Sequence, residues 1–271
     1  MTDSVAARKE LSKGTVPEGA ENETDASRKV REMFTQIAPR YDLLNHLLSL
    51  QMDRIWRAHT AKILAPILER KDAKILDLCC GTGDLAFALQ RKARGRVWGA
   101  DFAHTMLMRA KEKSEREKTA LLSPQGSASE DAHWTIPFVE SDALRLPFAD
   151  GTFDLVTAAF GFRNLANYES GLHEIRRVLK AGGTIAILEF TEPKPGWFGD
   201  LYRWYFRSVL PRLGGLISGD RRAYSYLPKS VARFFQPDEF VGLIEKCGFG
   251  EVRARVWTGG TVALHTAQKA D

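Results

Sequence analysis

A glycine turn and a later aspartate are the first residues whose types and spacing suggest chemistry. Gly81-Thr82-Gly83 follows the apolar run 74–79, and Asp101 ends a second apolar run about 20 residues further on. Glycine allows a tight turn and removes the Cβ that would keep a ligand away from the backbone. A carboxylate at the end of the second strand can accept hydrogen bonds from ribose hydroxyls. The pattern indicates a pocket for a nucleotide-like molecule.

Other interpretations of this pattern remain open. A tight turn followed by a helix that Asp84 caps would need no ligand. A site for NAD would begin in the same way, but Ala86 stands where the dinucleotide pattern has its third glycine. Asp142-Ala143 follows a third apolar run and favours a different nucleotide site, although an aspartate there could simply form a turn.

Together these segments resemble the motif series of class I methyltransferases, which use S-adenosylmethionine. The matching segments stand in the family's order and are Asp77-Leu78-Cys79-Cys80-Gly81-Thr82-Gly83-Asp84, Asp101, Asp142-Ala143 and Leu179-Lys180-Ala181-Gly182-Gly183. The resemblance implies that the turn from Gly81 to Gly83 packs beneath the methionine part of the cofactor. It also implies that Asp101 binds the ribose and that Asp142-Ala143 meets the adenine.

A more specific resemblance covers about residues 28 to 268. The segments that carry it are Ala38-Pro39-Arg40-Tyr41-Asp42, Phe160-Gly161-Phe162-Arg163-Asn164, Leu188-Glu189-Phe190-Thr191-Glu192, Ala223-Tyr224-Ser225-Tyr226-Leu227-Pro228 and Gly259-Gly260-Thr261-Val262-Ala263-Leu264-His265. They are similar to the C-methyltransferases of menaquinone and ubiquinone biosynthesis. One departure is Ala159, where many members carry a serine near the cofactor. The resemblance implies methylation of a polyprenylated quinol, with demethylmenaquinol favoured and a polyprenyl-benzoquinol or another small molecule as alternatives.

The chemistry of such a reaction identifies candidate catalytic residues. A quinol ring carbon becomes electron-rich when a hydroxyl loses its proton, so the protein must stabilise a phenolate. Arg163 is predicted to do this with its permanent charge, and pairing with a structural carboxylate is the alternative. Tyr41 is predicted to close the pocket or to bind a quinol oxygen, unless it only packs. Asn164 and His173 are explained by helix capping and by an exposed helical position. No cluster of metal ligands occurs, and transfer from a sulfonium requires no metal.

Alternating strand and helix patterns predict the frame that positions these residues. Strands are expected at 74–79, 96–100, 135–139, 153–160, 183–190, 251–257 and 260–267. Helices are expected from Ser27, through Pro66, and at 84–93, 106–118, 167–179 and 239–247. The helix at 167–179 is expected to stop at Ala181-Gly182-Gly183, and a surface insertion is expected at 119–133. The pattern indicates an α/β fold, and the resemblance implies a Rossmann-like, mostly parallel seven-stranded sheet with a C-terminal antiparallel strand.

Composition limits the organisation of the chain. Its 271 residues are 44% hydrophobic, which fits one α/β domain. We expect a disordered tail over 1–26 and a single methyltransferase domain over 27–271, with N-terminal helices over 27–70 and an inserted lid over 193–233. The three cysteines, Cys79, Cys80 and Cys247, suggest neither a disulfide framework nor a metal site and fit a reducing cytoplasm. No signal segment occurs, and no apolar run reaches the roughly 18 residues of a membrane span.

The segment 193–233 combines positive charge with aromatic side chains. Its acidic residues are Asp200 and Asp220, and its basic residues are Lys194, Arg203, Arg207, Arg212, Arg221, Arg222, Lys229 and Arg233. Such a segment could lie transiently on the inner face of a membrane and admit a prenyl tail, or it could be a lid packed on the core. Nucleic acid is not an expected partner, because no RNA-binding motif and no Asn-Pro-Pro-Tyr type site are present. A cofactor-binding protein without activity is a further alternative, and the sequence leaves a homodimer open.

Overall fold

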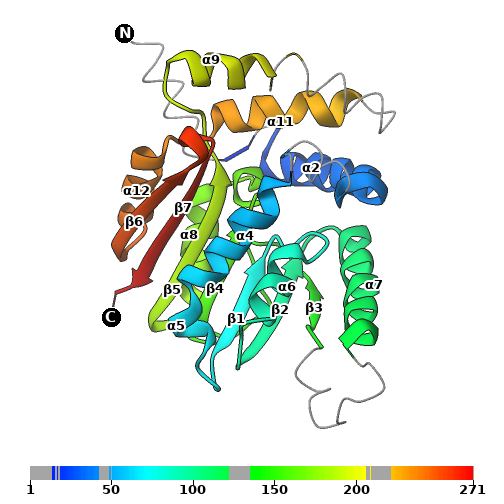
Figure 1. Cartoon of the computed structure of the whole chain (residues 1–271), viewed down its shortest axis with the longest axis vertical. Helices are drawn as coiled ribbons and strands as arrows, with labels where there is room; N and C mark the ends of the chain where they lie inside the picture. Colours follow the sequence, from blue (N-terminus) through cyan, green and yellow to red (C-terminus); the bar gives the residue numbers. More distant parts are fainter. Residues whose placement is uncertain are drawn as a thin grey trace.

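A seven-stranded sheet organises the chain, which this computed structural model describes at residues 14–15, 17, 19–42, 49, 51–121, 135–205, 208 and 221–270. The strands are β1 (Lys74–Leu78), β2 (Arg96–Asp101), β3 (Phe138–Glu140), β4 (Phe153–Ala159), β5 (Leu179–Phe190), β6 (Phe249–Trp257) and β7 (Val262–Lys269). Their order in the sheet is β3-β2-β1-β4-β5-β7-β6 (Figure 1). The pairs among β1 to β5 are parallel, whereas β7 runs antiparallel to β5 and β6, as the predicted fold class requires.

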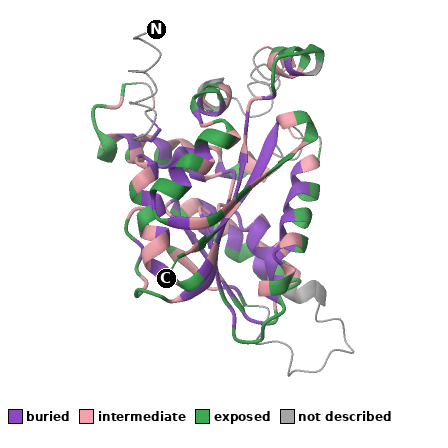
Figure 2. Ribbon diagram, turned by 90° about the vertical axis from the view of Figure 1, so that its left-hand side faces the viewer, coloured by how far each residue is buried: buried purple, intermediate pink, exposed green. Residues whose placement is uncertain are grey.

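Helices cover both faces of the sheet because successive strand residues point to opposite sides. The helices are α2 (Glu23–Ile37), α4 (Met52–Ile63), α5 (Ala65–Leu68), α6 (Asp84–Gln90), α7 (His104–Leu121), α8 (Tyr168–Val178), α9 (Trp197–Trp204), α11 (Arg221–Arg233) and α12 (Pro237–Lys246). Short 3-10 turns are η1 (Ala38–Arg40), η3 (Phe162–Asn164) and η5 (Thr258–Gly260). Leu76 packs with α8 and α12, and Ile75 packs with α4, α5 and α6. Figure 2 shows the buried residues concentrated between these layers.

Three helices lie beyond the carboxyl ends of the parallel strands. Figure 1 shows α2, α9 and α11 together at that end, above the sheet. Most of the predicted tail and of the predicted insertion at 119–133, together with Arg207 and Arg212, falls outside the described residues. Among the helices that the structure describes, none combines the length and apolar character that crossing a membrane requires.

Several predicted helix boundaries differ from the structure, and two of them have a clear physical cause. The helix expected from Ser27 begins at Glu23, because the Asn22 side chain accepts a hydrogen bond from the Asp25 backbone and caps it. The helix expected to stop at Ala181-Gly182-Gly183 ends at Val178, and this prediction was wrong. Leu179 is already extended and pairs with Phe153 in the sheet, so Gly182 with φ +67° lies inside β5. Pro66 does restart a helix, since it lies in the first turn of α5.

Asp154 ties together three strands at the opposite end of the sheet from the crevice. It is 6% exposed and accepts hydrogen bonds from the Lys74 backbone (2.9 Å), Lys180 Nζ (2.7 Å) and Arg70 Nη2 (2.8 Å). Burial alone would raise the pKa of Asp154, but the hydrogen bonds and positive charges, led by Lys180, outweigh burial and lower it. The ionised carboxylate therefore stabilises the fold.

Asp154→Asn is expected to lower the free energy of unfolding at pH 7 by about 1–3 kcal/mol, because charged hydrogen bonds are lost. The folded pKa lies below the unfolded value of about 4. The stabilisation is therefore complete above that value and disappears as pH falls through the folded pKa. Urea titrations at several pH values measure this. Asp150→Asn, at a side chain 79% exposed, is the control and should change little. The prediction would be contradicted if both variants lost the same free energy of unfolding, or if Asp154→Asn remained less stable than the unmodified protein in strong acid.

Candidate active site

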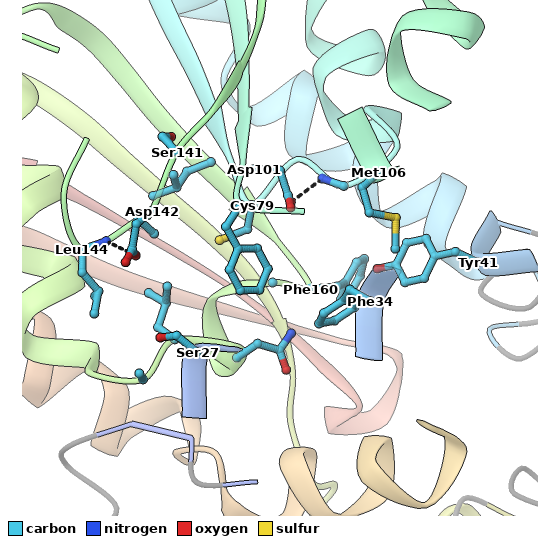
Figure 3. Close-up of a pocket in the computed structure, with 18 residues that line it drawn as sticks. Ser27, Phe34, Tyr41, Cys79, Asp101, Met106, Ser141, Asp142, Leu144 and Phe160 are labelled. Carbon is cyan, nitrogen blue, oxygen red and sulfur yellow. Dashed lines mark hydrogen bonds between the residues drawn. The ribbon is translucent and has the colours of Figure 1, made fainter. Parts of the chain in front are cut away.

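A cavity opens at the carboxyl ends of β1, β2 and β4, beneath the N-terminal helix α2 (Figure 3). The space of about 650 Å³ that it offers is continuous with the solvent. The lining residues used below are Phe34, Tyr41, Cys79, Gly81, Asp101, Ser141, Asp142, Ala143, Phe160 and Asn164. The cavity lies between β1 and β4, where strand order reverses, which is the usual ligand position in open α/β sheets.

The backbone around this crevice adopts unusual conformations. Cys79 (φ +53°) and Phe160 (φ +59°) follow β1 and β4 and are both left-handed, which is uncommon for side chains with a Cβ and is often found at functional sites. Gly161 allows the two segments to approach, because a Cβ there would lie 2.5 Å from the Cys79 Cβ. Gly81, with φ +55°, supplies the turn that the sequence predicts.

Asp101 holds the glycine turn and faces the cavity. Its Oδ2 accepts a hydrogen bond from the Gly81 backbone (2.9 Å), and its Oδ1 accepts one from the Ala103 backbone (2.8 Å). The side chain is 6% exposed, and burial, as the largest effect, raises its pKa to about 6. Further along the wall, Asp142 Oδ1 accepts a hydrogen bond from Leu144 (2.9 Å), and Ala143 is buried (Figure 3).

The structure therefore brings Gly81, Asp101, Asp142, Ala143 and Tyr41 to one cavity. The other predicted cofactor residues, Thr82 and Gly83, are not among the lining residues. Gly83 begins α6, where a Cβ would lie 2.8 Å from the Phe87 ring.

Thr82 instead joins the glycine turn to the N-terminal segment. Its hydroxyl donates to Asp42 Oδ1 (2.5 Å), and Lys113 Nζ donates to Asp42 Oδ2 (2.9 Å), to Thr82 Oγ1 (3.1 Å) and to Asp84 Oδ1 (2.5 Å). Asp42 follows Tyr41, whose ring lies edge-on to Phe34 with centroids 5.9 Å apart. This polar cluster therefore holds the two aromatic side chains over the cavity.

Arg163 is 5% exposed and is not among the lining residues. Its Nη1 donates to Glu189 Oε1 (2.6 Å) and to the Phe160 carbonyl, and its backbone N–H donates to Glu189 Oε2 (3.2 Å). Burial is the largest effect and opposes the charge of Arg163, but Glu189 together with Tyr41 and Tyr226 outweighs it, so the pKa of Arg163 is raised. The structure thus shows the alternative that the sequence left open, a pairing with a buried carboxylate. The pair braces the loop that follows β4.

Asn164 is a cavity residue that the sequence explained only as a helix cap. It is 7% exposed, and its Oδ1 accepts a hydrogen bond from the Tyr226 hydroxyl (3.0 Å). Its Nδ2 has no hydrogen-bond partner among the described residues. A buried donor without a partner is costly unless a ligand or water satisfies it, so the side chain is a binding candidate. In the sequence, the sign that Asn164 could belong to the site is that it directly follows Arg163 in the segment 160–164. His173 is exposed, as predicted.

Comparisons with known proteins agree with this architecture. The model of the ubiE/COQ5 methyltransferase family matches residues 22–269. A protein of Thermus thermophilus named demethylmenaquinone methyltransferase is 47% identical, covering 88% of this chain and 100% of that protein. One of Deinococcus radiodurans with the same name is 42% identical, covering 90% and 94%. A SAM-dependent methyltransferase structure from Thermotoga maritima shares the fold at 17% identity, with a TM-score of 0.59 and coverage of 88% and 99%.

The affinity for S-adenosylmethionine is expected to depend on pH through Asp101. The carboxylate, not the carboxyl group, accepts hydrogen bonds from both ribose hydroxyls, so protonation competes with binding. With a pKa of about 6 in the free protein, affinity should be constant above pH 7 and fall about tenfold per unit well below pH 6. Calorimetry between pH 5 and 8 measures this, and Asp101→Asn should bind weakly without the pH dependence. A dependence that survives in the variant would implicate another carboxyl, such as Asp77, whose pKa burial raises to about 7.

Proposed function

The chain belongs to the ubiE/COQ5 methyltransferase family, and we propose that it methylates a ring carbon of a polyprenylated quinol, with demethylmenaquinol as the favoured substrate. The observation that supports this proposal is a cavity with aromatic walls that contains a buried carboxylate, Asp101, and the Asn164 amide donor, which has no hydrogen-bond partner among the described residues. The names of relatives 35 to 47% identical favour a naphthoquinol. Methylation of a polyprenyl-benzoquinol is the alternative.

The cavity residues fit S-adenosylmethionine. Asp101 offers a carboxylate for the ribose, and Gly81 presents backbone without a side chain for the methionine part. Asp142-Ala143 stands where the adenine would bind, and the neighbouring Ser141 hydroxyl is buried without a partner among the described residues. When bound, the cofactor supplies an electrophilic methyl group on a sulfonium.

The remaining residues suit a quinol ring. Phe34, Tyr41 and Phe160 form apolar walls that would exclude water, and Tyr41, which lines the cavity and contacts Phe34, would close it. Asn164 Nδ2 can donate to the phenolate oxygen, which favours loss of the quinol proton to water. S-adenosylmethionine, held by Gly81, Asp101 and Asp142-Ala143, would supply the methyl group to the ring carbon while the C–S bonding electrons stay on its sulfur, and the displaced ring proton would pass to water. Arg163 acts by holding the loop that carries Asn164.

Methyl-labelled cofactor, incubated with reduced demethylmenaquinone or with a reduced polyprenyl-benzoquinone lacking the ring methyl, tests the proposal by mass spectrometry. We expect label on a naphthoquinol ring carbon and none on either oxidised quinone, whose ring is electron-poor. Asn164→Leu should lower kcat by about 10²-fold while affinity for the cofactor stays within about twofold. His173→Asn, at an exposed helical position, is the matched control. No transfer to either reduced substrate, with cofactor binding intact, would refute the quinol assignment.

We also propose that α9 contacts the membrane surface that holds the substrate. Trp197, Leu201 and Trp204 are 81%, 53% and 59% exposed, and their spacing puts them on one helical face. Asp200 pairs with Arg203, and the nearby segments carry the exposed cations Lys194, Lys229 and Arg233. Exposed tryptophans with neighbouring cations are typical of peripheral binding to anionic lipid, here at the inner face of the membrane. The site would then lie close to prenyl tails in the bilayer.

Replacement of Trp197, Leu201 and Trp204 by serine is expected to lower binding to phosphatidylglycerol vesicles at least about tenfold, because three apolar contacts are lost. Flotation at low and high salt measures binding, and methylation of a short-chain soluble quinol should be retained. Ile55→Ser with Met108→Ser removes exposed apolar side chains elsewhere and is the control. Equal binding of all three proteins would argue against α9 as the membrane contact.

A further inference from the structure

A chain of side-chain hydrogen bonds connects the lid helix α11 to the cavity. The Tyr226 hydroxyl donates to Asn164 Oδ1 (3.0 Å) and also contacts Thr15 Oγ1 (3.1 Å). Thr15 is itself fixed, because its backbone N–H donates to the Leu165 carbonyl (2.8 Å) and its side chain is buried. Segments far apart in the sequence thus meet at the Tyr226 hydroxyl.

The Tyr226 hydroxyl has a single proton, which determines which group donates in each of these hydrogen bonds. Because that proton goes to Asn164 Oδ1, the Thr15 hydroxyl donates to Tyr226, and Asn164 keeps Nδ2 for a cavity ligand. If the amide were reversed, its oxygen would face the cavity and repel an anionic ligand. Burial raises the pKa of Tyr226, so the hydroxyl remains a donor at neutral pH.

We propose that Tyr226 is a positioning residue, which fixes the Asn164 amide with Nδ2 toward the cavity as a donor to the anionic ring oxygen of the quinol. The inference rests on the proposed function. An amide donor favours an acceptor with negative charge, and a phenolate satisfies this requirement better than the neutral hydroxyl does. The carboxylate of the cofactor is also a negatively charged acceptor for Nδ2, and the experiment below distinguishes it from the phenolate.

The loop backbone has supports other than Tyr226. Arg163 is held by Glu189, and the Tyr168 hydroxyl donates to the Arg163 carbonyl (2.8 Å). Tyr226→Phe removes only the hydroxyl that orients Asn164. Tyr168→Phe removes a hydroxyl from the same loop without touching that amide and is therefore the matched control.

The experiment measures kcat against pH at saturating cofactor, using the reduced quinol in detergent and the full chain. For Tyr226→Phe we expect kcat at pH 7 to fall about tenfold, with affinity for the cofactor within about twofold. The deficit should shrink as pH rises, because the quinol then ionises without the donor. For Tyr168→Phe any loss should be the same at all pH values. Tyr226→Phe combined with Asn164→Leu should be no slower than Asn164→Leu alone, since both act through one amide.

Three outcomes would overturn the inference: an unchanged kcat in Tyr226→Phe, a loss independent of pH, or a loss additive with that of Asn164→Leu. Weakened cofactor binding with an unchanged pH profile would also overturn it and assign the amide to the cofactor carboxylate. Methyl transfer by the unmodified protein tests the proposed function. The ratio of kcat for Tyr226→Phe to kcat for the unmodified protein tests the role of Tyr226. A failure of the proposed function is therefore distinguishable from a failure of this inference.

Discussion

The reversal of strand order between β1 and β4 is the constraint on which the rest of the site depends. The connections after these two neighbouring strands leave toward different sides of the sheet, and the space between them becomes the crevice. The left-handed backbone of Cys79 and Phe160 turns the chain directly after β1 and β4. Gly161 has no Cβ, so the segments after the two strands can lie close together. The cavity residues that lie on the strands or on the loops directly after them are therefore positioned by the strand ends.

The buried charged residues near this crevice differ in how far their charges are compensated. Arg163 and Glu189 satisfy each other and several backbone groups, and such a pair stabilises geometry more than it stabilises the fold. Among the described residues, Asp101 accepts hydrogen bonds from backbone N–H groups, and burial outweighs these bonds and the nearby charge of Arg31, so its pKa rises. A carboxylate in that condition gains from further donors, which ribose hydroxyls supply. The pair of Arg163 and Glu189 therefore supports the loop, whereas the carboxylate of Asp101 can accept hydrogen bonds from a ligand.

Local patterns predicted the α/β fold and the glycine turn, because each depends on a strand and the turn that follows it. The family resemblance added the seven-stranded sheet and the approach of Asp101 and Asp142-Ala143 to one cavity. The partners of Arg163 and Thr82 depend instead on how distant segments align. Glu189 reaches Arg163 because Ala159 pairs with Leu188 between β4 and β5, a register that sequence spacing does not specify. The helix stop predicted at Gly182 failed for the same reason, since pairing of Leu179 with Phe153 prevailed over local glycine preference.

The cavity has one rigid wall and one wall attached by polar contacts. Strand ends packed in the apolar core form the first, whereas Tyr41 and α11 are joined to it through Lys113 with Asp42 and through Tyr226 with Asn164. Such contacts exchange readily for water, and each contributes little net free energy compared with core burial. Opening the second wall, which would also separate Tyr41 from the small apolar cluster of Ala38, Ala103 and Met106, therefore requires less free energy than disturbing the sheet. This asymmetry suits a substrate whose ring must enter a dry cavity while its long apolar tail stays outside.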